Sequence, residues 1–224
     1  MCGRFTQSFT WAELQSFYNL LVEAAPNLKP SWNVAPTQEI DVIGAKETGG
    51  LGFARMRWGL VPSWAKDASA GAKMINARAD TIAEKPAFRE AVRKRRCVIP
   101  VSGFFEWQGS GAAKTPWHIT SAKGEPLSLA GLWERWRDGE GQWMRTATII
   151  TTDANEALRP LHHRMPVILA RADVETWLAE GDARLLKPCA NEWLTRSPVS
   201  PRVNNVRNDA PDLIEAADAA STLL

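Results

Sequence analysis

The sequence has few of the features that mark membrane-spanning or secreted proteins. No apolar run in its 224 residues approaches the roughly 18 residues that are needed to cross a bilayer. No positively charged segment leads into an apolar stretch at the N-terminus, and the three cysteines, Cys2, Cys97 and Cys189, are too few and too irregularly spaced to suggest a disulfide framework. These absences exclude a membrane-spanning helix and predict a reduced, cytoplasmic protein.

Patterns that bind metals or carry a large charge are also missing. The chain has 3 histidines and neither a CxxC nor an HExxH motif, so nothing in it predicts a metal centre, and we expect no cofactor. Its 27 basic and 25 acidic side chains give a net charge of +2, which is too small to indicate a nucleic-acid partner. The total hides an asymmetry, because the segment from Asp209 to the end holds 4 acidic residues and no basic one. Residues 1–208 therefore carry 27 basic and 25 less 4, or 21, acidic side chains, a net charge of +6.

Tryptophan, in contrast, is unusually frequent. The chain contains 11 Trp, 7 Phe and 1 Tyr. Indole rings are typical both of packed cores and of surfaces on which nucleic-acid bases stack. The composition alone leaves these two explanations open.

Residue patterns predict a few short helices and many short strands. The Thr10–Glu13 capping box starts a helix whose apolar face extends to about residue 24. Pro86 starts a second short helix with a basic end, and Asp173 caps a third over residues 174–180. β-Branched and aromatic runs between Gly, Pro and Ser turns predict strands at 53–60, 97–101, 115–120, 127–133, 146–151 and 167–170. We therefore expect one α+β domain over residues 1–224 with an extensively antiparallel sheet and a short acidic tail from about residue 209.

Cys2 is chemically the most unusual residue of the chain. The small side chain at position 2 makes removal of Met1 plausible, which leaves a cysteine with a free α-amine beside its thiol. An α-amine has a reference pKa of about 7.7 to 8.0, so a useful neutral fraction is nucleophilic at cytoplasmic pH, whereas a lysine near 10.4 offers little. Cys97 opens an apolar run and is interpreted as a structural thiol, and the surroundings of Cys189 are uninformative.

Seven motifs occur along the chain in a fixed order. They are MCGRF (1–5), WNVAP (32–36), WGLVPSW (58–64), INARAD (75–80), GFFEW (103–107), HHRMP (162–166) and PVSPRVNN (198–205). In sequence and order they resemble the SOS-response-associated peptidase (SRAP) family, whose members process abasic sites in DNA, and the match runs essentially end to end. The resemblance implies a single-domain, barrel-like β core with short flanking helices, and a monomer that joins the nucleoid when it engages DNA.

The same resemblance implies a DNA-damage function. In this family the mature N-terminal cysteine attacks the ring-opened aldehyde of an abasic deoxyribose in single-stranded DNA and ends as a thiazolidine crosslink. The chemistry suits Cys2, because an amine and an aldehyde form a Schiff base onto which a neighbouring thiol can close a five-membered ring. AP lyase activity, by β-elimination, and self-removal of Met1 are further activities that the resemblance implies.

Three other residues are matched to the family's catalytic positions. Glu106 lies between Phe105 and Trp107, where aromatic surface is expected to raise its pKa and suit it to proton transfer during ring opening. Asn76 cannot titrate and is expected to orient the terminal amine or the sugar. His162 is assigned acid–base work at the Schiff base.

Taken alone, each of these catalytic candidates has a structural interpretation. Glu106 would be an outward-facing strand carboxylate and Asn76 a turn residue. His163 stands where the family usually has Asp; because neighbouring residues normally point apart, only one of the two histidines is expected to enter the site. His118, in an apparent strand, is interpreted as structural.

A second set of motif residues is matched to DNA contacts. Guanidinium groups suit phosphate oxygens, indole rings stack on bases without sequence preference, and the remaining members supply edge contacts or a hydroxyl. The set comprises Arg4, Arg78 and Arg164 for phosphates, Trp64 and Trp107 for stacking, Asn33 and Pro36 as edge contacts, and the hydroxyl of Thr151. Trp133, Trp136 and Trp177 are expected to pack in the interior, and the basic run 93–96 is interpreted as a solvated helix end.

Three alternative functions remain open on the sequence. Glutamine amidotransferases also begin Met-Cys-Gly, and an N-terminal-cysteine amidohydrolase would release ammonia from glutamine. The family's historical name suggests a peptidase whose only substrate is its own Met1, which is compatible with crosslinking. A noncovalent single-strand binder would form no adduct with an abasic oligonucleotide.

Overall fold

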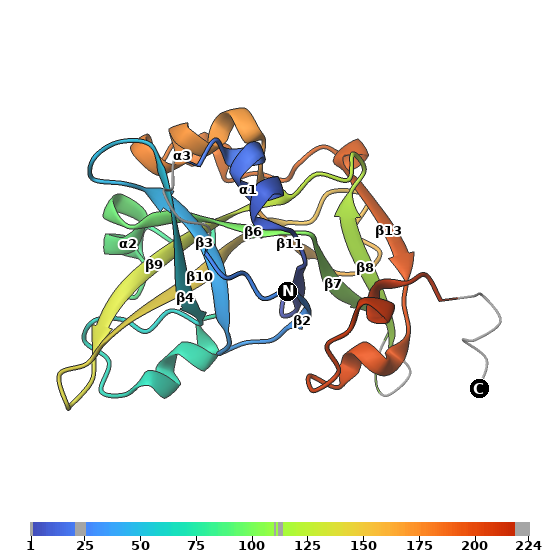
Figure 1. The fold of residues 1–224 in the computed structure, drawn as a ribbon, viewed down its shortest axis with the longest axis horizontal. Helices are drawn as coiled ribbons and strands as arrows, with labels where there is room; N and C mark the ends of the chain where they lie inside the picture. Colours follow the sequence, from blue (N-terminus) through green and yellow to red (C-terminus); the bar gives the residue numbers. More distant parts are fainter. Residues whose placement is uncertain (1, 21–25, 110, 112–113, 218–224) are drawn as a thin grey trace.

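A closed barrel of five strands forms the centre of the protein (Figure 1). The computed structural model describes residues 2–20, 26–109, 111 and 114–217. The barrel order is β10-β4-β3-β6-β9, and it closes because β9 also pairs with β10. Neighbouring strands are antiparallel except β4 and β10, which are parallel. The barrel strands are β3 (Glu39–Ala45), β4 (Leu51–Trp58), β6 (Arg96–Val101), β9 (Leu127–Arg137) and β10 (Trp143–Asp153). This architecture confirms the predicted α+β class with a barrel-like, largely antiparallel core.

Additional strands extend the barrel at one end and form a second sheet beside it. The second sheet is antiparallel, with the order β13-β8-β7-β1-β2. Its members are β1 (Phe5–Gln7), β2 (Ser31–Val34), β7 (Gly103–Gln108), β8 (Thr115–Ser121) and β13 (Leu194–Pro198). The barrel extensions are β5 (Asn76–Arg78) and β11 (Arg164–Pro166), which both pair with β10, and β12 (Ile168–Leu169), which pairs with β9.

The three predicted helices exist, but all are short. The capping box of Thr10 and Glu13 is present and starts α1 (Trp11–Tyr18), which ends at Asn19 in the left-handed conformation. The prediction that this helix extends to about residue 24 is therefore wrong, because the helix ends at Asn19. Residues 21–25 lie outside the described part. The second helix, α2 (Arg89–Lys94), starts three residues after Pro86. The third, α3 (Val174–Glu180), has Asp173 at its N-cap position, although this side chain makes no capping hydrogen bond.

Short 3₁₀ helices connect the other elements. They are η1 (Ala68–Lys73), η2 (Arg171–Asp173), η3 (Ala183–Leu185), η4 (Asn191–Trp193), η5 (Pro201–Asn204) and η6 (Pro211–Ile214). Among the described residues, no helix is long and apolar enough to cross a membrane.

Apolar side chains fill the barrel and also lie between its outer wall and the helices. Inside, Phe5 packs against Trp58 with ring centroids 4.6 Å apart. Outside, Leu14 of α1 and Trp177 of α3 cover the barrel strands. Each fully buried side chain of this size stabilises the fold by roughly 1.5–3 kcal/mol. Trp177 and Trp136 are buried, as predicted for packing residues.

The basic run at the end of α2 is bound to the fold rather than solvated throughout. The Arg96 guanidinium donates to the main-chain oxygens of Trp177 and Ala179, each at 2.8 Å, and so fixes the C-terminal end of α3 to β6. Arg95 forms a 2.6 Å ion pair with the buried carboxylate of Glu134. The interpretation of 93–96 as a solvated helix end is therefore wrong for these two arginines, because their guanidiniums satisfy buried acceptors.

Candidate active site

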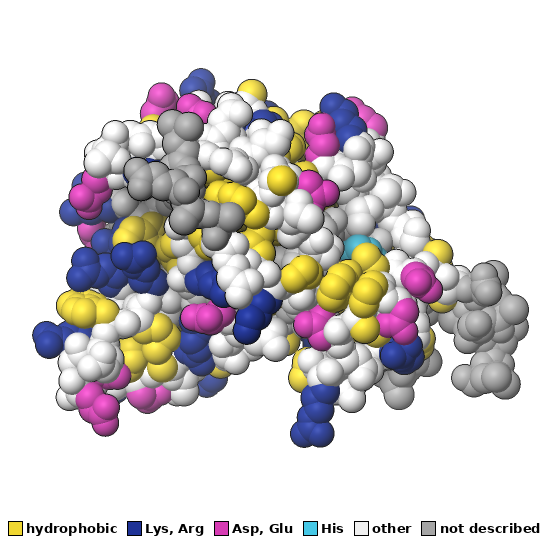
Figure 2. Space-filling view, in the orientation of Figure 1, with side chains coloured by type: hydrophobic (Ala, Val, Ile, Leu, Met, Phe, Trp, Pro, Cys, Tyr) yellow, Lys and Arg dark blue, Asp and Glu magenta, His cyan; other side chains and the backbone are white. Residues whose placement is uncertain are grey.

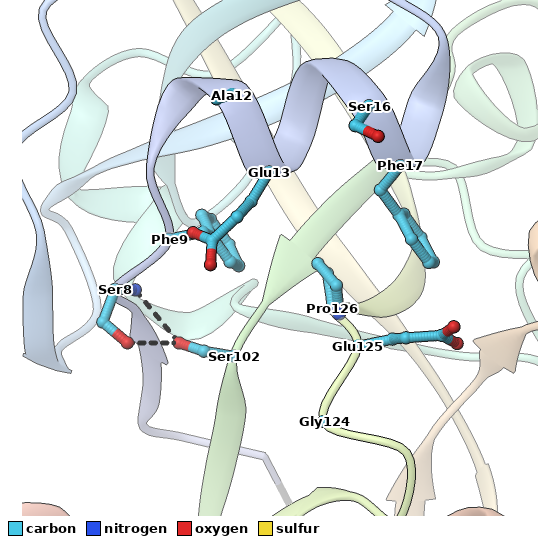
Figure 3. Close-up of a pocket in the computed structure, with 10 residues that line it drawn as sticks. All are labelled: Ser8, Phe9, Ala12, Glu13, Ser16, Phe17, Ser102, Gly124, Glu125 and Pro126. Carbon is cyan, nitrogen blue, oxygen red and sulfur yellow. Dashed lines mark hydrogen bonds between the residues drawn. The ribbon is translucent and has the colours of Figure 1, made fainter.

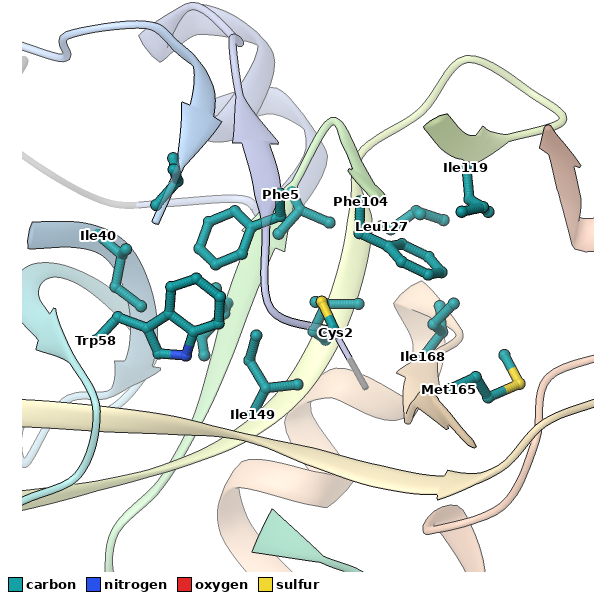
Figure 4. Close-up of a cluster of buried hydrophobic side chains, with 14 of the residues drawn as sticks. Cys2, Phe5, Ile40, Trp58, Phe104, Ile119, Leu127, Ile149, Met165 and Ile168 are labelled. Atoms are coloured by element: carbon teal, nitrogen blue, oxygen red, sulfur yellow. The ribbon is translucent and has the colours of Figure 1, made fainter. Parts of the chain in front are cut away.

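Cys2 lies in the interior, at the point where the N-terminal segment enters the barrel. Its side chain is 0% exposed and packs in the same cluster as Phe104, Ile149 and Met165 (Figure 4). Burial raises the pKa of the Cys2 thiol, and the negative charge of Glu106 raises it further. The thiol therefore stays protonated at neutral pH, and it is chemically distinct from a pre-activated thiolate nucleophile.

Asn76 fixes the main chain at Cys2. It stands on β5, which pairs with Ile149 of β10 and so reaches the end of the barrel where Cys2 lies. The Asn76 Nδ2 donates to the Cys2 main-chain oxygen at 2.9 Å. Its Oδ1 is buried and has no hydrogen-bond partner among the described residues. A buried acceptor without a partner is costly, so this oxygen is a candidate acceptor for a substrate or amine hydrogen.

Glu106 faces the same cluster from the second sheet. On β7 it shares a face with Phe104, because alternate strand residues point the same way, whereas Phe105 and Trp107 point to the opposite face. The side chain is 5% exposed, and burial raises its pKa as predicted. The reason differs from the prediction, however: the desolvating surface lies around Phe104, not at the sequence neighbours of Glu106.

The two histidines precede β11 and lie together. The His162 Nδ1 accepts a hydrogen bond from the Arg164 main-chain N–H at 2.9 Å, so the neutral ring carries its proton on Nε2. Partial burial lowers the His162 pKa, which keeps the ring neutral at pH 7. The His162 and His163 rings are stacked, with centroids 4.3 Å apart. The expectation that these neighbours point apart is therefore wrong.

Arg164 is an internal residue. The side chain is 6% exposed, and its Nη1 donates to Asp153 Oδ1 at 2.9 Å while Nη2 donates to the Thr151 main-chain oxygen at 2.7 Å. Thr151 is also buried, and its hydroxyl donates to the Ala77 main-chain oxygen at 3.5 Å. These contacts join β11 and β5 to the end of β10. They favour a structural role for both residues, and the phosphate contact of Arg164 stays a prediction.

Replacing Arg164 by glutamine is expected to lower stability and to leave the DNA salt dependence unchanged. Glutamine cannot reproduce the forked contacts, and leaving one buried acceptor unsatisfied costs about 1–3 kcal/mol, or a melting temperature lower by roughly 2–12 °C at about 2–4 °C per kcal/mol. Thermal unfolding and the salt dependence of oligonucleotide affinity, measured well below the melting temperature, provide the check. A salt slope reduced by about 0.7, without a stability loss, would support the phosphate role.

Arg4, Asn33 and Trp107 are brought together beneath the C-terminal segment. The Arg4 Nη1 donates to Asn33 Oδ1 at 2.7 Å, and its guanidinium lies 5.9 Å from the centroid of Trp107. The Asn33 Nδ2 lies within hydrogen-bond distance of the main-chain oxygens of Val203, Asn205 and Asn208. Trp107 Nε1 donates to Asn204 Oδ1 at 2.7 Å. This role of Asn204 was not predicted, although the late motif that contains Asn204 was a signal for it.

The remaining predicted contacts lie at the surface. Arg78 is exposed and pairs through two nitrogens with Asp80. Trp64 is 66% exposed on the loop after β4, and Pro36 is half-buried in the turn after β2.

His118 is buried against Phe105, and burial lowers its pKa to about 4, which agrees with a structural histidine.

The surface also has a cavity that is separate from the predicted site. A cavity of about 610 Å³ lies between α1 and residues 124–126 (Figure 3), and none of the predicted site residues lines it. Within the part of the chain that the structure describes, no group of three His, Cys, Asp or Glu side chains is placed to hold a metal ion.

Known proteins resemble the chain along almost its whole length. The profile of the family described as SOS response associated peptidase (SRAP) matches residues 1–206. The chain is 39% identical over 227 residues to the abasic site processing protein YoqW of Bacillus subtilis, covering 96% of this chain and 100% of YoqW. It is 37% identical over 189 residues to the chicken (Gallus gallus) abasic site processing protein HMCES, covering 71% of this chain and 56% of that protein. A crystal structure of a protein from Bacteroides thetaiotaomicron superposes with a TM-score of 0.85 at 29% identity, covering 96% of this chain and 100% of that one.

Proposed function

Because this chain belongs to the SOS response associated peptidase (SRAP) family, we propose that it recognises abasic sites in single-stranded DNA and crosslinks to them through Cys2. The observation that carries the proposal is the arrangement around the N-terminus. The Cys2 main chain is held by Asn76, and the Cys2 thiol lies within the electrostatic reach of the buried Glu106 carboxyl. Removal of Met1 turns the α-nitrogen at this place into a free amine.

The proposed reaction has two bond-forming steps. The α-amine attacks the C1′ aldehyde of the ring-opened sugar, and the resulting carbinolamine loses water to give an imine. The thiol then adds to the imine carbon, and its proton goes to the imine nitrogen, which closes the thiazolidine. No oxidant or cofactor is needed, because the aldehyde and the aminothiol supply every atom of the thiazolidine and of the water that leaves.

Protonation states favour this order of steps. Since the buried thiol stays neutral, the amine is the first nucleophile. The raised pKa of Glu106 suits it to donate a proton as water leaves and to accept one as the thiol adds. Asn76 Oδ1 is placed to accept a hydrogen from the amine or the carbinolamine.

We assign His162 to proton transfer at the sugar, including reversal of the crosslink and β-elimination. Its neutral ring presents Nε2–H, because Nδ1 is occupied by the Arg164 N–H. For DNA contacts, Arg78 and Trp64 are the exposed candidates, with Pro36 at an edge. Arg4 and Trp107 are further candidates for DNA contacts beside residues 203–208, whereas the buried Asn33, Arg164 and Thr151 position the site.

Replacing His162 by alanine is expected to slow crosslink reversal and strand cleavage by about 10²–10⁴-fold, the usual range for loss of a general acid–base. Because the His162 pKa is lowered, the ring stays in its Nε2–H donor form from pH 6.5 upward, so the part of the wild-type rate that depends on His162 should be level over this range. His163→Ala serves as the matched control, since it removes the stacking neighbour and leaves the Nε2–H donor in place, and it should keep this profile. Equal defects in the two variants, measured by quenched time courses, would contradict the assignment.

The direct test of the proposed function is adduct formation. Protein whose Met1 is removed is incubated with single-stranded DNA that carries one abasic site, and the product is heated in detergent before electrophoresis. A heat-stable adduct that is absent with undamaged DNA supports the proposal, and its absence overturns it. Ammonia release from glutamine in the same preparation would instead favour the amidohydrolase alternative.

A further inference from the structure

The hairpin that joins β9 and β10 carries an exposed tryptophan among arginines. Trp143 is 59% exposed. The Arg135 guanidinium lies 4.5 Å from the ring centroid, and that of Arg137 lies 5.6 Å away. Lys and Arg side chains gather beside exposed hydrophobic ones on the left of the molecule (Figure 2), the side toward which this hairpin extends (Figure 1). We call Arg135, Arg137, Trp143 and Arg145 the hairpin patch.

The positive charge of the hairpin patch is not neutralised locally. Arg145 stands directly opposite Arg135 in the strand register. Among the ion pairs of the described residues, none engages Arg135, Arg137 or Arg145. The nearby carboxylate of Asp138 instead accepts main-chain N–H groups of the turn. Two arginines against one open indole ring, with a third opposite Arg135 on the neighbouring strand, are suited to an anionic, aromatic partner.

The hairpin patch lies on the same face of its two strands as the site. The register pairs Trp143 with Arg137, Arg145 with Arg135 and Ala147 with Trp133, without interruption. Because opposed residues share a face and alternate residues repeat it, Trp143 and Arg145 face the same side as Ala147 and Ile149, which pack inside the barrel with Cys2.

Strand geometry also gives the distance along this face. Ile149 pairs with Asn76, the residue that holds Cys2. Along β10, Ile149 and Trp143 are six residues apart, which is about 20 Å. Ala147 and Ile149 are buried in the core between these two levels, so a strand bound at Cys2 would reach the hairpin patch over the outer surface, across at least this distance.

We propose that the hairpin patch is a second contact for single-stranded DNA, at which a base several nucleotides from the lesion stacks on Trp143 while the arginines bind the flanking phosphates. The inference rests on the proposed function, because it extends the strand that is bound at Cys2. Stacking together with phosphate contacts binds any sequence, which suits a lesion that occurs in any sequence context. The site at Cys2 supplies chemistry, and the hairpin patch supplies affinity and holds the strand.

The test is noncovalent binding measured by fluorescence anisotropy with labelled oligonucleotides that carry one tetrahydrofuran abasic analogue, which fixes the position that enters the site but has no aldehyde and cannot crosslink. The long probes extend about ten nucleotides to the 5′ or the 3′ side of the position that enters the site, within the usual range of single-strand site sizes; the short probe has a single nucleotide on each side. Trp143→Ala is expected to weaken binding of one long probe about tenfold and to leave the short probe unchanged. Trp143→Phe should retain most of the affinity.

Two further variants sharpen the test. Replacing both Arg135 and Arg137 by Ser should lower the salt slope for the long probe by about 1.4, because each phosphate contact on a single strand contributes about 0.7. Trp193→Ala removes another exposed indole, 38% exposed at η4, and should change nothing. Unchanged long-probe affinity in the Trp143→Ala and double-arginine variants would overturn the inference, as would equal losses with the short probe.

Failure of this inference can be told apart from failure of the proposed function. Adduct formation at saturating DNA depends on Cys2 and should be the same in wild type and Trp143→Ala. An adduct together with unaltered long-probe binding in the variant removes the hairpin patch and leaves the crosslinking function. Patch-dependent binding without any adduct supports the hairpin patch and removes the crosslinking function.

Discussion

Replacing Cys2 by alanine or serine is expected to reduce the heat-stable adduct with abasic single-stranded DNA to background. Both variants keep an α-amine after Met1 is removed, so both should still form the imine, which borohydride traps. Neither has the thiol that closes the five-membered ring, so the imine stays open to hydrolysis. Electrophoresis after heating, with and without borohydride, separates the two products.

Controls for the Cys2 variants use the other thiols of the chain. Cys189→Ala removes a second buried thiol, and its adduct yield should match that of the wild type. Mass spectrometry must first show that Met1 is absent in every protein compared, because a blocked amine would mimic the loss of the thiol. A heat-stable adduct that survives Cys2→Ala in full would show that another nucleophile reacts, and the proposed mechanism would then be wrong.

The order of the motifs predicted more of the site than the local pattern of any one of them. Asn76, Glu106 and Cys2 are far apart in the sequence, and the structure joins them because β5 lies against β10 while β7 faces the same cluster from the second sheet. The family resemblance placed these residues in one site. The residues alone could not, because a lone strand Glu or turn Asn has a structural explanation of equal merit.

The roles of the three motif arginines were the least predictable part of the candidate site. Arg4, Arg78 and Arg164 stand in similar motifs, yet Arg78 is exposed, Arg4 is half-buried and Arg164 is buried. The Arg164 guanidinium is held inside because it donates to the Thr151 main-chain oxygen and to Asp153 at the end of β10. A motif preserves residue identity but does not reveal which acceptor the folded chain will place beside it.

Barrel closure was also beyond the local pattern. Six strands were predicted near their observed positions, but β3 and the short β1, β2, β5, β7, β11 and β13 were not. Three-residue strands such as β5 and β11 carry too few positions for a period of two to be visible. The barrel also needs the parallel pairing of β4 with β10, which joins segments almost ninety residues apart and has no local signal.

Replacing Glu106 by glutamine is expected to slow adduct formation by about 10²–10⁴-fold, the range for loss of a general acid–base group. The pH profile should change with it. The neutral α-amine requires high pH and the protonated carboxyl requires low pH, so the wild-type profile is a bell whose falling limb lies above the usual carboxyl range, because burial raises the Glu106 pKa. Glutamine cannot titrate, so this limb should vanish and leave only the rise that belongs to the amine.

Stability separates this effect from misfolding. Since the Glu106 pKa is higher in the folded chain than in the unfolded one, the folded state binds more protons, and stability falls as pH rises through the folded pKa. A neutral amide avoids that penalty, so Glu106→Gln should melt no lower than wild type at pH 7. Asp41→Asn is the matched control, because Asp41 is likewise buried with a raised pKa but pairs with Arg55. Its adduct rate should be unchanged.

The Glu106 variant also decides how Met1 is removed. If Glu106→Gln retains Met1 after expression, the carboxyl acts in self-processing, and the adduct rate must be compared on protein whose Met1 has been removed by an added aminopeptidase. If Met1 is already absent, removal does not need Glu106, and the peptidase hypothesis loses its principal residue. A wild-type adduct rate in fully matured Glu106→Gln would contradict the proton-transfer role, since no other carboxyl among the described residues is placed by its charge against the Cys2 thiol.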